Sequence, residues 1–334
     1  MNKIVAYARL LRIPGLGALA IPPVIGALTV GISDFFTLII LFSIGAFAAM
    51  YGFILNDYAD VELDKLVKEL HGKPLVSGDI SKKTAIAICI FCSLLVFLLL
   101  SLLWRGNTLN EYKFMALLCI VIAGMLGSIY NLYGKKIPGS DFFVSTSMAF
   151  IFLSGALAVG IPNVITWIIF ILTFNQALHM NVIEGGIKDA DHDYIMGVKN
   201  IALSSGVKVD GGKIFIPISF KAFGMGIRLF SACLLFVPFI ILHYDYQIWQ
   251  LAILAVITSV VLFFSAKLLS IKTFERGTIQ KYIGIQSFLR YSLVPIMLVS
   301  IIDPVYCLIL IVFPIIWYIL FTPLLGEKLF RPRM

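Results

Sequence analysis

The apolar stretch 35–56 ends in the polar sequence Asn56-Asp57-Tyr58-Ala59-Asp60-Val61-Glu62-Leu63-Asp64. This nonapeptide holds four of the 18 acidic residues in a chain of 334. A helix with about 3.6 residues per turn would place Asn56, Asp60 and Asp64 on one face. Carboxylates in line repel one another unless a cation lies between them, and hard divalent cations bind carboxylate and amide oxygens. The stretch therefore predicts a divalent-cation site at the end of a membrane-length segment.

The composition predicts an integral membrane protein, because 60% of the residues are hydrophobic and only 13% are charged. Runs of about 20 apolar residues are long enough to cross a bilayer. Ten such runs fall near 14–33, 35–56, 83–104, 114–133, 141–161, 164–187, 222–243, 247–269, 283–302 and 304–322. Only Asp303-Pro304 separates the last two runs, so the expected fold is an all-α, polytopic membrane bundle of nine or ten helices around a central cavity. We expect the first run to be a retained helix rather than a signal peptide.

The basic residues predict the orientation of the chain in a cell membrane. If the N-terminus is cytoplasmic, alternating spans place all but four of the 26 Lys and Arg residues in cytoplasmic loops or at the two termini. This count includes Lys328, Arg331 and Arg333. The exceptions are Arg105, Lys113, Arg228 and Arg290. The distribution explains the net charge of +8 without a nucleic-acid partner.

A second acidic cluster, Lys188-Asp189-Ala190-Asp191-His192-Asp193, follows the sixth apolar run. Asp189 and Asp193 would again share a helical face, and four spans separate the two clusters. The pattern predicts one domain, 1–334, with a parallel internal repeat. Its first half is about 14–133, its second half about 141–270, and 271–334 adds C-terminal helices. Both motifs would then lie on the cytoplasmic side.

Two opposed acidic motifs with lysines nearby suit the binding of a diphosphate. Mg²⁺ is seldom caged by protein ligands alone and readily bridges carboxylates to phosphate oxygens. Metal and lysine together would stabilise the leaving group when an allylic diphosphate ionises. We therefore expect Mg²⁺, as two ions, and an isoprenyl diphosphate donor. Glu62 and Asp191 fall off the shared faces and are expected to be solvated or outside direct metal contact.

Three motifs in order resemble those of the UbiA superfamily of intramembrane prenyltransferases. They are Asn56-Asp57-x-x-Asp60-x-x-x-Asp64 with Lys73-Pro74-Leu75, then Tyr130-Asn131-Leu132-Tyr133-Gly134-Lys135-Lys136, and last Asp189-Ala190-Asp191-His192-Asp193 with Gly197-Val198-Lys199-Asn200. The resemblance covers roughly residues 10–270. It implies a bundle typically of nine membrane helices around a cavity open laterally to lipid. It also implies Mg²⁺-dependent transfer of a polyprenyl group from its diphosphate to a hydrophobic or amphipathic acceptor.

The resemblance also assigns roles to residues of this sequence. The metal ligands would be Asn56, Asp60, Asp64, Asp189 and Asp193. The catalytic residues would be Asp57, Asp60, Tyr130, Asp189 and Asp193, with Tyr130 near the allylic carbon. The diphosphate would be bound by Lys73, Lys135, Lys136 and Lys199.

Some features depart from the family pattern and leave the acceptor open. Glu69-Leu70 stands where many members have a basic residue followed by threonine, and a tenth helix would be an addition. Residues 207–217 alternate around Asp210-Gly211-Gly212, which predicts a short β-hairpin in a loop. The acceptor could be an aromatic quinone precursor or the hydroxyl of a glycerol-phosphate lipid.

The sixth apolar run is richer in polar groups than its neighbours. Asn175 and His179 share a face and are the candidate acceptor contacts; the alternative is that they make hydrogen bonds between helices. Arg290 is similarly ambiguous. The alternative from a different class of protein is a membrane transporter with a parallel repeat, in which the cytoplasmic acidic motifs bind cations. Transporters, however, usually place their ion-binding acidic residues near the bilayer midplane. The acids here lie at helix ends, which favours the enzyme.

Overall fold

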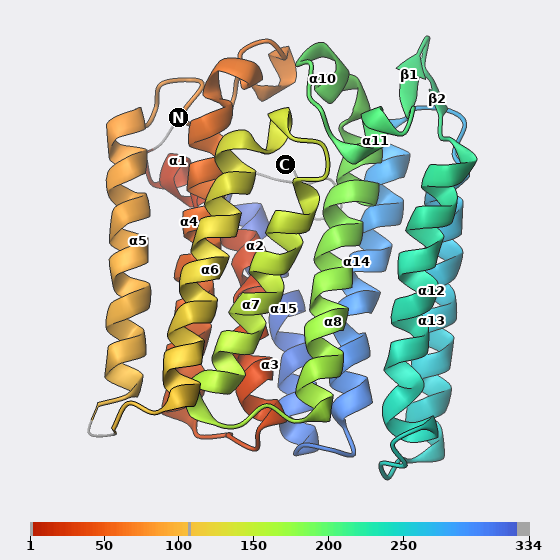
Figure 1. Ribbon diagram of the computed structural model, residues 1–334. Helices are drawn as coiled ribbons and strands as arrows, with labels where there is room; N and C mark the ends of the chain where they lie inside the picture. Colours follow the sequence, from red (N-terminus) through yellow and green to blue (C-terminus); the bar gives the residue numbers. More distant parts are fainter. Residues whose placement is uncertain (1–2, 106–107, 326–334) are drawn as a thin grey trace.

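The computed structural model describes residues 3–105 and 108–325. Lys328, Arg331 and Arg333, which contribute to the predicted orientation, lie outside these ranges. The described chain is almost entirely helical (Figure 1). In chain order its elements are α1 (Lys3–Leu10), α2 (Ile13–Leu19), α3 (Pro22–Thr29), α4 (Phe35–Asp64), η1 (Lys68–Leu70), α5 (Lys82–Leu103), α6 (Glu111–Tyr133), η2 (Gly134–Lys136), α7 (Asp141–Val159), α8 (Val164–Leu178), the π-helix η3 (His179–Gly185), α9 (Gly186–Lys188), α10 (Ala190–Ile195), α11 (Ile201–Ser204), β1 (Lys208–Asp210), β2 (Lys213–Phe215), α12 (Ile218–Ile240), α13 (Ile248–Leu269), α14 (Arg276–Leu298) and α15 (Pro304–Leu324).

The long helices run side by side as a membrane bundle. Among the described residues, nine segments are long and apolar enough to cross a bilayer. The helix α14 has a similar length of 23 residues and runs within the same bundle, but it is more polar and is not one of the nine (Figure 1). Its polarity comes partly from the buried side chains Gln286 and Arg290. The chain is therefore a multi-pass membrane protein with nine apolar spans and one further long helix in the part described.

The first span is interrupted, whereas the run at 14–33 was expected to be one helix. Arg12 adopts left-handed backbone angles between α1 and α2. The helix α3 begins at Pro22-Pro23, and proline disfavours a helical conformation in the residue before it and cannot donate a backbone hydrogen bond. The N-terminal segment therefore crosses as three short helices.

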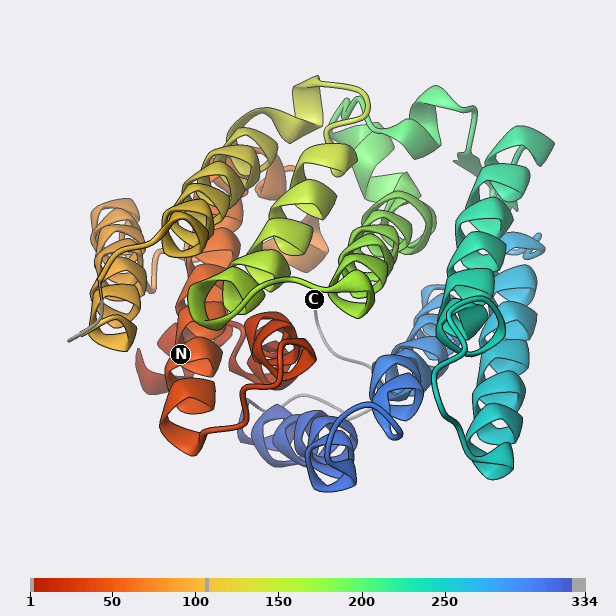
Figure 2. The ribbon, with the colours of Figure 1, turned by 60° about the horizontal axis from the view of Figure 1, so that its bottom comes forward.

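The C-terminal helix α15 lies between α2 and α14 (Figure 2). The indole Nε1 of Trp317 donates to the backbone oxygen of Ile13 over 2.8 Å. A side chain at Gly17 would meet the Trp317 ring at 2.4 Å, so glycine lets this ring lie against the helix. The last helix thus packs directly on the first span.

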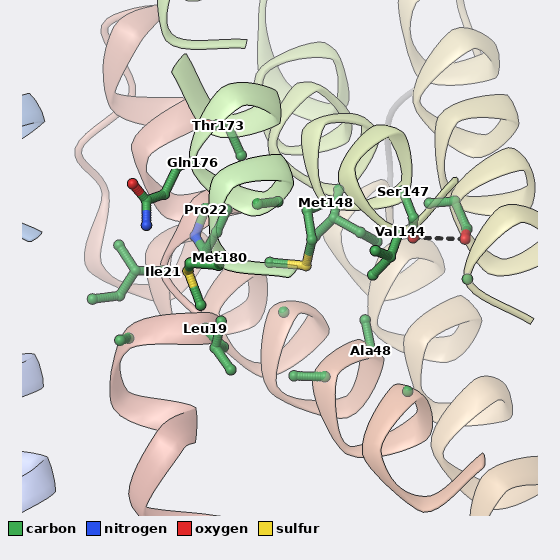
Figure 3. A pocket seen from close by; sticks show the side chains of 18 of the residues that line it. Leu19, Ile21, Pro22, Ala48, Val144, Ser147, Met148, Thr173, Gln176 and Met180 are labelled. Atoms are coloured by element: carbon green, nitrogen blue, oxygen red, sulfur yellow. Dashed lines mark hydrogen bonds between the residues drawn. The ribbon is translucent and has the colours of Figure 1, made fainter. Parts of the chain in front are cut away.

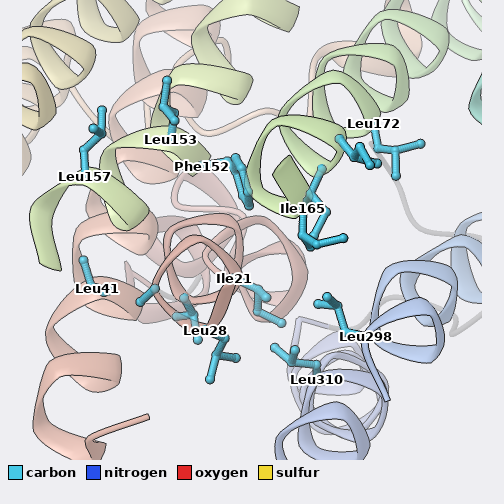
Figure 4. Close-up of a cluster of buried hydrophobic side chains, with 14 of the residues drawn as sticks. Ile21, Leu28, Leu41, Phe152, Leu153, Leu157, Ile165, Leu172, Leu298 and Leu310 are labelled. Carbon is cyan, nitrogen blue, oxygen red and sulfur yellow. The ribbon is translucent and has the colours of Figure 1, made fainter. Parts of the chain in front are cut away.

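A buried hydrophobic cluster joins the helices in the half of the bundle away from the acidic motifs. It includes Leu28, Leu41, Phe152, Ile165, Leu298 and Leu310 (Figure 4). Beside it, α3 crosses α7 in close contact, because a Cβ on Gly26 would lie 2.4 Å from the Phe152 carbonyl oxygen and one on Gly155 would lie 2.1 Å from that of Pro23. Small residues at a helix crossing allow such close backbone approach in membranes.

The predicted hairpin at 207–217 is confirmed. The strands β1 and β2 pair antiparallel with Asp210 opposite Lys213. Gly211 and Gly212 both have positive φ, as a two-residue hairpin turn requires. The backbone N–H of Phe274 donates to the Gly212 carbonyl over 2.8 Å, which fixes the hairpin to the segment before α14.

Candidate functional site

A cavity of about 1020 Å³ lies inside the bundle and is lined by residues from α2 to α8, η3 and α12 to α15. Side chains such as Leu19, Ile21, Met148 and Met180 approach it from different helices (Figure 3). Its polar lining includes Arg12, Asn56, Tyr130, Asn181, Gln176, Arg228 and Arg290. The cavity is long, mostly apolar and polar at particular points, which suits an amphipathic ligand.

The first acidic motif lies on the last two turns of α4, so the predicted helix is confirmed. The buried acidic residues on this stretch are Asp57, Asp60 and Asp64. The Nζ of Lys73 lies 3.2 Å from Asp57 Oδ1 and 2.7 Å from Asp64 Oδ2. Burial alone would lower the pKa of Lys73, but Asp57 and Asp64 raise it above its ordinary value, so the ammonium is fully charged.

Two more cations reach the same carboxylates from other elements. The Nζ of Lys135, in η2, lies 3.0 Å from Asp60 Oδ2. The Nη2 of Arg12, between α1 and α2, lies 3.2 Å from Asp57 Oδ1. Basic groups from three separate segments therefore surround one acidic helix end.

The second motif does not lie on one uninterrupted helix, as its spacing had suggested. The chain departs from helical angles at Asp189, between α9 and α10. The N–H of Asp193 still donates to the Asp189 carbonyl over 2.8 Å, which keeps the two residues one turn apart. Burial and the neighbouring Asp189 raise the pKa of Asp193 to about 7, and the amide of Asn200 donates to its carboxylate over 2.7 Å.

The two motifs meet at the same end of the bundle, the top in Figure 1. The charges of Lys135 and Asp60, from the first half of the chain, both act on Asp193. The backbone N–H of Lys199 donates to the Lys135 carbonyl over 2.8 Å, which joins the loop after α10 to the loop after α6. The structure thus brings together residues more than a hundred positions apart in the sequence.

The remaining predicted residues occupy different positions. The side chains of Lys136 and Lys199 are exposed, so of the adjacent pair it is Lys135 that reaches the carboxylates. Glu62 is exposed beside Lys65 and Lys82, as expected for a solvated residue. Tyr130 lines the cavity, and its hydroxyl donates to Asn181 Oδ1 over 3.4 Å.

The structure corrects the placement of Asn175 and His179. The amide of Asn175 donates to Ser231 of α12 over 3.2 Å, which is the interhelical alternative. His179 is fully buried, and its Nδ1 lies 3.2 Å from Glu184 Oε1. A π-helix begins at His179 and changes the register of side chains along this segment. The polar residues of this segment that line the cavity are instead Thr173, Gln176 and Asn181.

A model of the UbiA prenyltransferase family matches residues 19–282. The chain belongs to this family. It is 29% identical to a 4-hydroxybenzoate octaprenyltransferase of Tolumonas auensis over 175 residues, which is 51% of this chain and 57% of that protein. The match therefore spans less than two thirds of the relative's length.

Solved structures agree with the UbiA fold. A structure described as digeranylgeranylglyceryl phosphate synthase in membranes aligns with a TM-score of 0.65 and 21% identity, covering 90% of this chain and 99% of that one. A UbiA homologue from Archaeoglobus fulgidus bound to GPP and Mg²⁺ aligns with a TM-score of 0.60 and 18% identity, covering 89% and 99%. At these identities the likeness establishes the fold.

This UbiA-family chain also carries a buried ionic cluster that the sequence patterns did not predict. Glu184 lies in η3, and Arg228 and Arg290 lie in α12 and α14. The Nη2 of Arg228 donates to Glu184 Oε1 over 2.8 Å, and Arg290 donates to both Glu184 oxygens. The available signal was that Arg228 and Arg290 lie inside apolar runs, but the sequence does not show that three separate helices converge.

Proposed function

We propose that the protein transfers a polyprenyl group from an isoprenyl diphosphate to a lipid-soluble or amphipathic acceptor within the membrane. One observation carries this proposal. Two acidic motifs gather with the cations Lys73, Lys135 and Arg12 at one end of the bundle, and Arg12 and Asn56 of this group line a mostly apolar cavity. A charged diphosphate suits the polar end, and an isoprenoid chain suits the apolar part.

The carboxylates fit Mg²⁺ that is bound together with a diphosphate. In the described part of the chain, no three His, Cys, Asp or Glu side chains are grouped tightly enough to hold a metal alone. Mg²⁺ commonly uses one or two carboxylates plus phosphate oxygens, so such a cage is not needed. Burial and the neighbouring Asp189 raise the pKa of Asp193, so a bound cation would stabilise its ionised form. We assign Asn56, Asp60 and Asp64 to one ion and Asp189 and Asp193 to a second.

The mechanism follows from the positions of these side chains. Bound Mg²⁺ would neutralise negative charge that develops on the pyrophosphate leaving group. Lys73 and Lys135 exchange their carboxylate partners for phosphate oxygens, with Lys136 and Lys199 at the entrance. Asp57 holds Lys73 and Arg12 in place. The Tyr130 ring faces the allylic carbon and stabilises the carbocation, while the apolar walls exclude water that would otherwise capture it.

The orientation and the internal division of the chain belong to the same proposal. We place the N-terminus and both acidic motifs on the cytoplasmic side of the cell membrane, because the basic residues favour that side. The single domain 1–334 would consist of two parallel halves, each with one acidic motif, followed by C-terminal helices.

Metal removal and an acceptor survey test the proposal. Membranes that contain the protein should convert labelled geranylgeranyl diphosphate and an acceptor to a prenylated product when Mg²⁺ is present. EDTA should reduce the rate to background, and excess Mg²⁺ should restore it. Aromatic and glyceryl-phosphate acceptors should be assayed in parallel. Undiminished product formation in EDTA would remove the metal from the mechanism.

Asp191→Asn should reduce transfer by less than about threefold, although Asp191 lies between two proposed metal ligands. Its carboxylate accepts from Arg276 over 2.7 Å and is partly exposed, and pairs of this kind contribute about 0–1 kcal/mol. The initial rate at saturating donor and Mg²⁺ is the measurement. Asp193→Asn, assayed beside it, is the contrasting variant. Equal losses in the two would show that the whole segment, rather than Asp193, carries the effect.

A further inference from the structure

The cluster of Glu184, Arg228 and Arg290 contains more positive than negative charge. In the described ranges, Glu184 is the only carboxylate within ion-pair distance of either arginine. The other hydrogen-bonding partners of Arg228 are Ser265 and Gln176, both uncharged. The group therefore has two guanidiniums for one carboxylate.

All three side chains are deeply buried within the bundle. Their exposed fractions are 3% for Glu184, 5% for Arg228 and 8% for Arg290. An unpaired charge in such surroundings costs several kcal/mol, and ionisable residues inside membrane proteins commonly mark substrate sites. A ligand that brings one negative charge would balance the cluster.

The excess charge is accessible from the cavity, since both arginines line it. The Nε of Arg290 is buried and has no hydrogen-bonding partner among the described residues. Gln176 also lines the cavity, and its Oε1 accepts from Arg228 over 3.0 Å. The amide nitrogen of the same side chain can serve as a further donor at the cavity wall. Several donors therefore meet at one wall of the cavity.

The position of this wall matches the needs of a second substrate. Glu184, in η3, precedes Asp189 of the second acidic motif by only five residues, so the arginine cluster lies just below that motif in the bundle. Asn181 and Tyr130 line the cavity as well and bond to each other. An anionic group at the arginines would lie deeper in the membrane than the diphosphate, with Tyr130 close to the reacting atoms.

We infer that Arg228 and Arg290 bind the acid group of the acceptor, either a carboxylate or a phosphate, and select against neutral acceptors. This inference rests on the proposed prenyl transfer. It narrows the acceptor to an anionic amphipathic acid. Glu184 holds the two guanidiniums in position and offsets one of their two charges before the acceptor binds.

Matched acceptor pairs and Arg290→Gln test the inference in membranes that contain the full chain. The acceptors are 4-hydroxybenzoate and its methyl ester, and a prenyl-glyceryl phosphate and its dephosphorylated alcohol. The wild type should prefer at least one acid over its neutral counterpart. Arg290→Gln leaves Arg228 and Glu184 as a neutral pair, so the fold should persist. It should raise the KM of the preferred acid at least about 30-fold and leave the KM of the donor within twofold.

Three controls distinguish recognition of the acid group from a general loss of structure. Arg105→Gln, the same change at an exposed arginine, should alter neither KM. Arg290→Lys should recover part of the acid preference. The preferred acid should raise the Tm of the wild type and have no effect on that of Arg290→Gln, and this readout requires no turnover.

The possible outcomes are distinguishable. Equal use of acid and ester by the wild type would overturn the inference, as would equal losses with both acceptors in Arg290→Gln, which indicate a structural role. A thermal shift that appears only when anionic lipid is added would assign the site to lipid and also overturn it. If the acid shifts the Tm through Arg290 but the wild type never consumes the donor, the anion site stands and the prenyl-transfer proposal fails.

Discussion

Asp60→Ala and Asp193→Ala are each expected to lower prenyl transfer by at least about 10²–10³-fold, the cost of losing a group that stabilises charge in the transition state. Asp60 pairs with Lys135 over 3.0 Å, and the charges of both act on Asp193. Each substitution therefore removes a proposed metal ligand and also disturbs the junction between the two motifs. The rate of pyrophosphate release with saturating donor, acceptor and Mg²⁺ is the measurement.

Glu62→Ala is the matched control, because Glu62 lies on the same helix two residues from Asp60 but is exposed. Its activity should stay within twofold of the wild type. A lower apparent affinity for Mg²⁺ in Asp60→Asn, where the shape of the side chain is kept, would connect the loss to the metal. Full activity in both alanine variants would show that the two motifs do not act together on the donor.

Gly155→Leu is expected to destabilise the fold by about 3 kcal/mol or more, because even a Cβ at this position would lie 2.1 Å from the Pro23 carbonyl oxygen. The contact is with backbone, so no side-chain rotation can relieve it. Either α3 or α7 must move, and both helices line the cavity. The Tm of the purified protein in detergent measures the loss, with yield from membranes as a second readout.

Gly226→Ala provides the comparison, since a Cβ there meets nothing within 4 Å. Alanine favours a helix over glycine by about 1 kcal/mol, so the Tm of this variant should stay the same or rise. If Gly155→Leu kept the wild-type Tm, the close crossing of α3 and α7 would not be needed for stability.

Features set by local sequence were predictable. The spacing of Asn56, Asp60 and Asp64 predicted a helix that continues past the apolar run, and α4 extends to Asp64. Asp210-Gly211-Gly212 predicted the hairpin, because few residues other than glycine readily adopt positive φ in both turn positions. The sequence did not show whether Lys135 or Lys136 reaches the carboxylates. The side chains of adjacent residues point in different directions, and the fold decides which of the two faces Asp60.

Features that depend on distant packing were not predictable. Glu184 and Arg290 are 106 residues apart, and nothing local to either shows that they meet. Asn175 and His179 do share a helical face, but the fold turns that face toward neighbouring helices and not toward the cavity. The π-helix that starts at His179 then shifts the register of the side chains after it, which the sequence did not indicate. Asp189 interrupts a helix that its spacing with Asp193 suggested was continuous.

The pairing of α15 with the first span has a consequence for biogenesis. Trp317 bonds to Ile13, and the hydroxyl of Tyr306 donates to the Ser33 carbonyl over 2.8 Å, across 304 and 273 residues of chain. Chains emerge from the ribosome N-terminus first, and contacts between distant residues form late. The α2 segment enters the bilayer long before α15 and therefore waits for α15 before this packing is complete. Until α15 has been synthesised, lipid or an insertion factor must shield the α2 surface that Trp317 later covers.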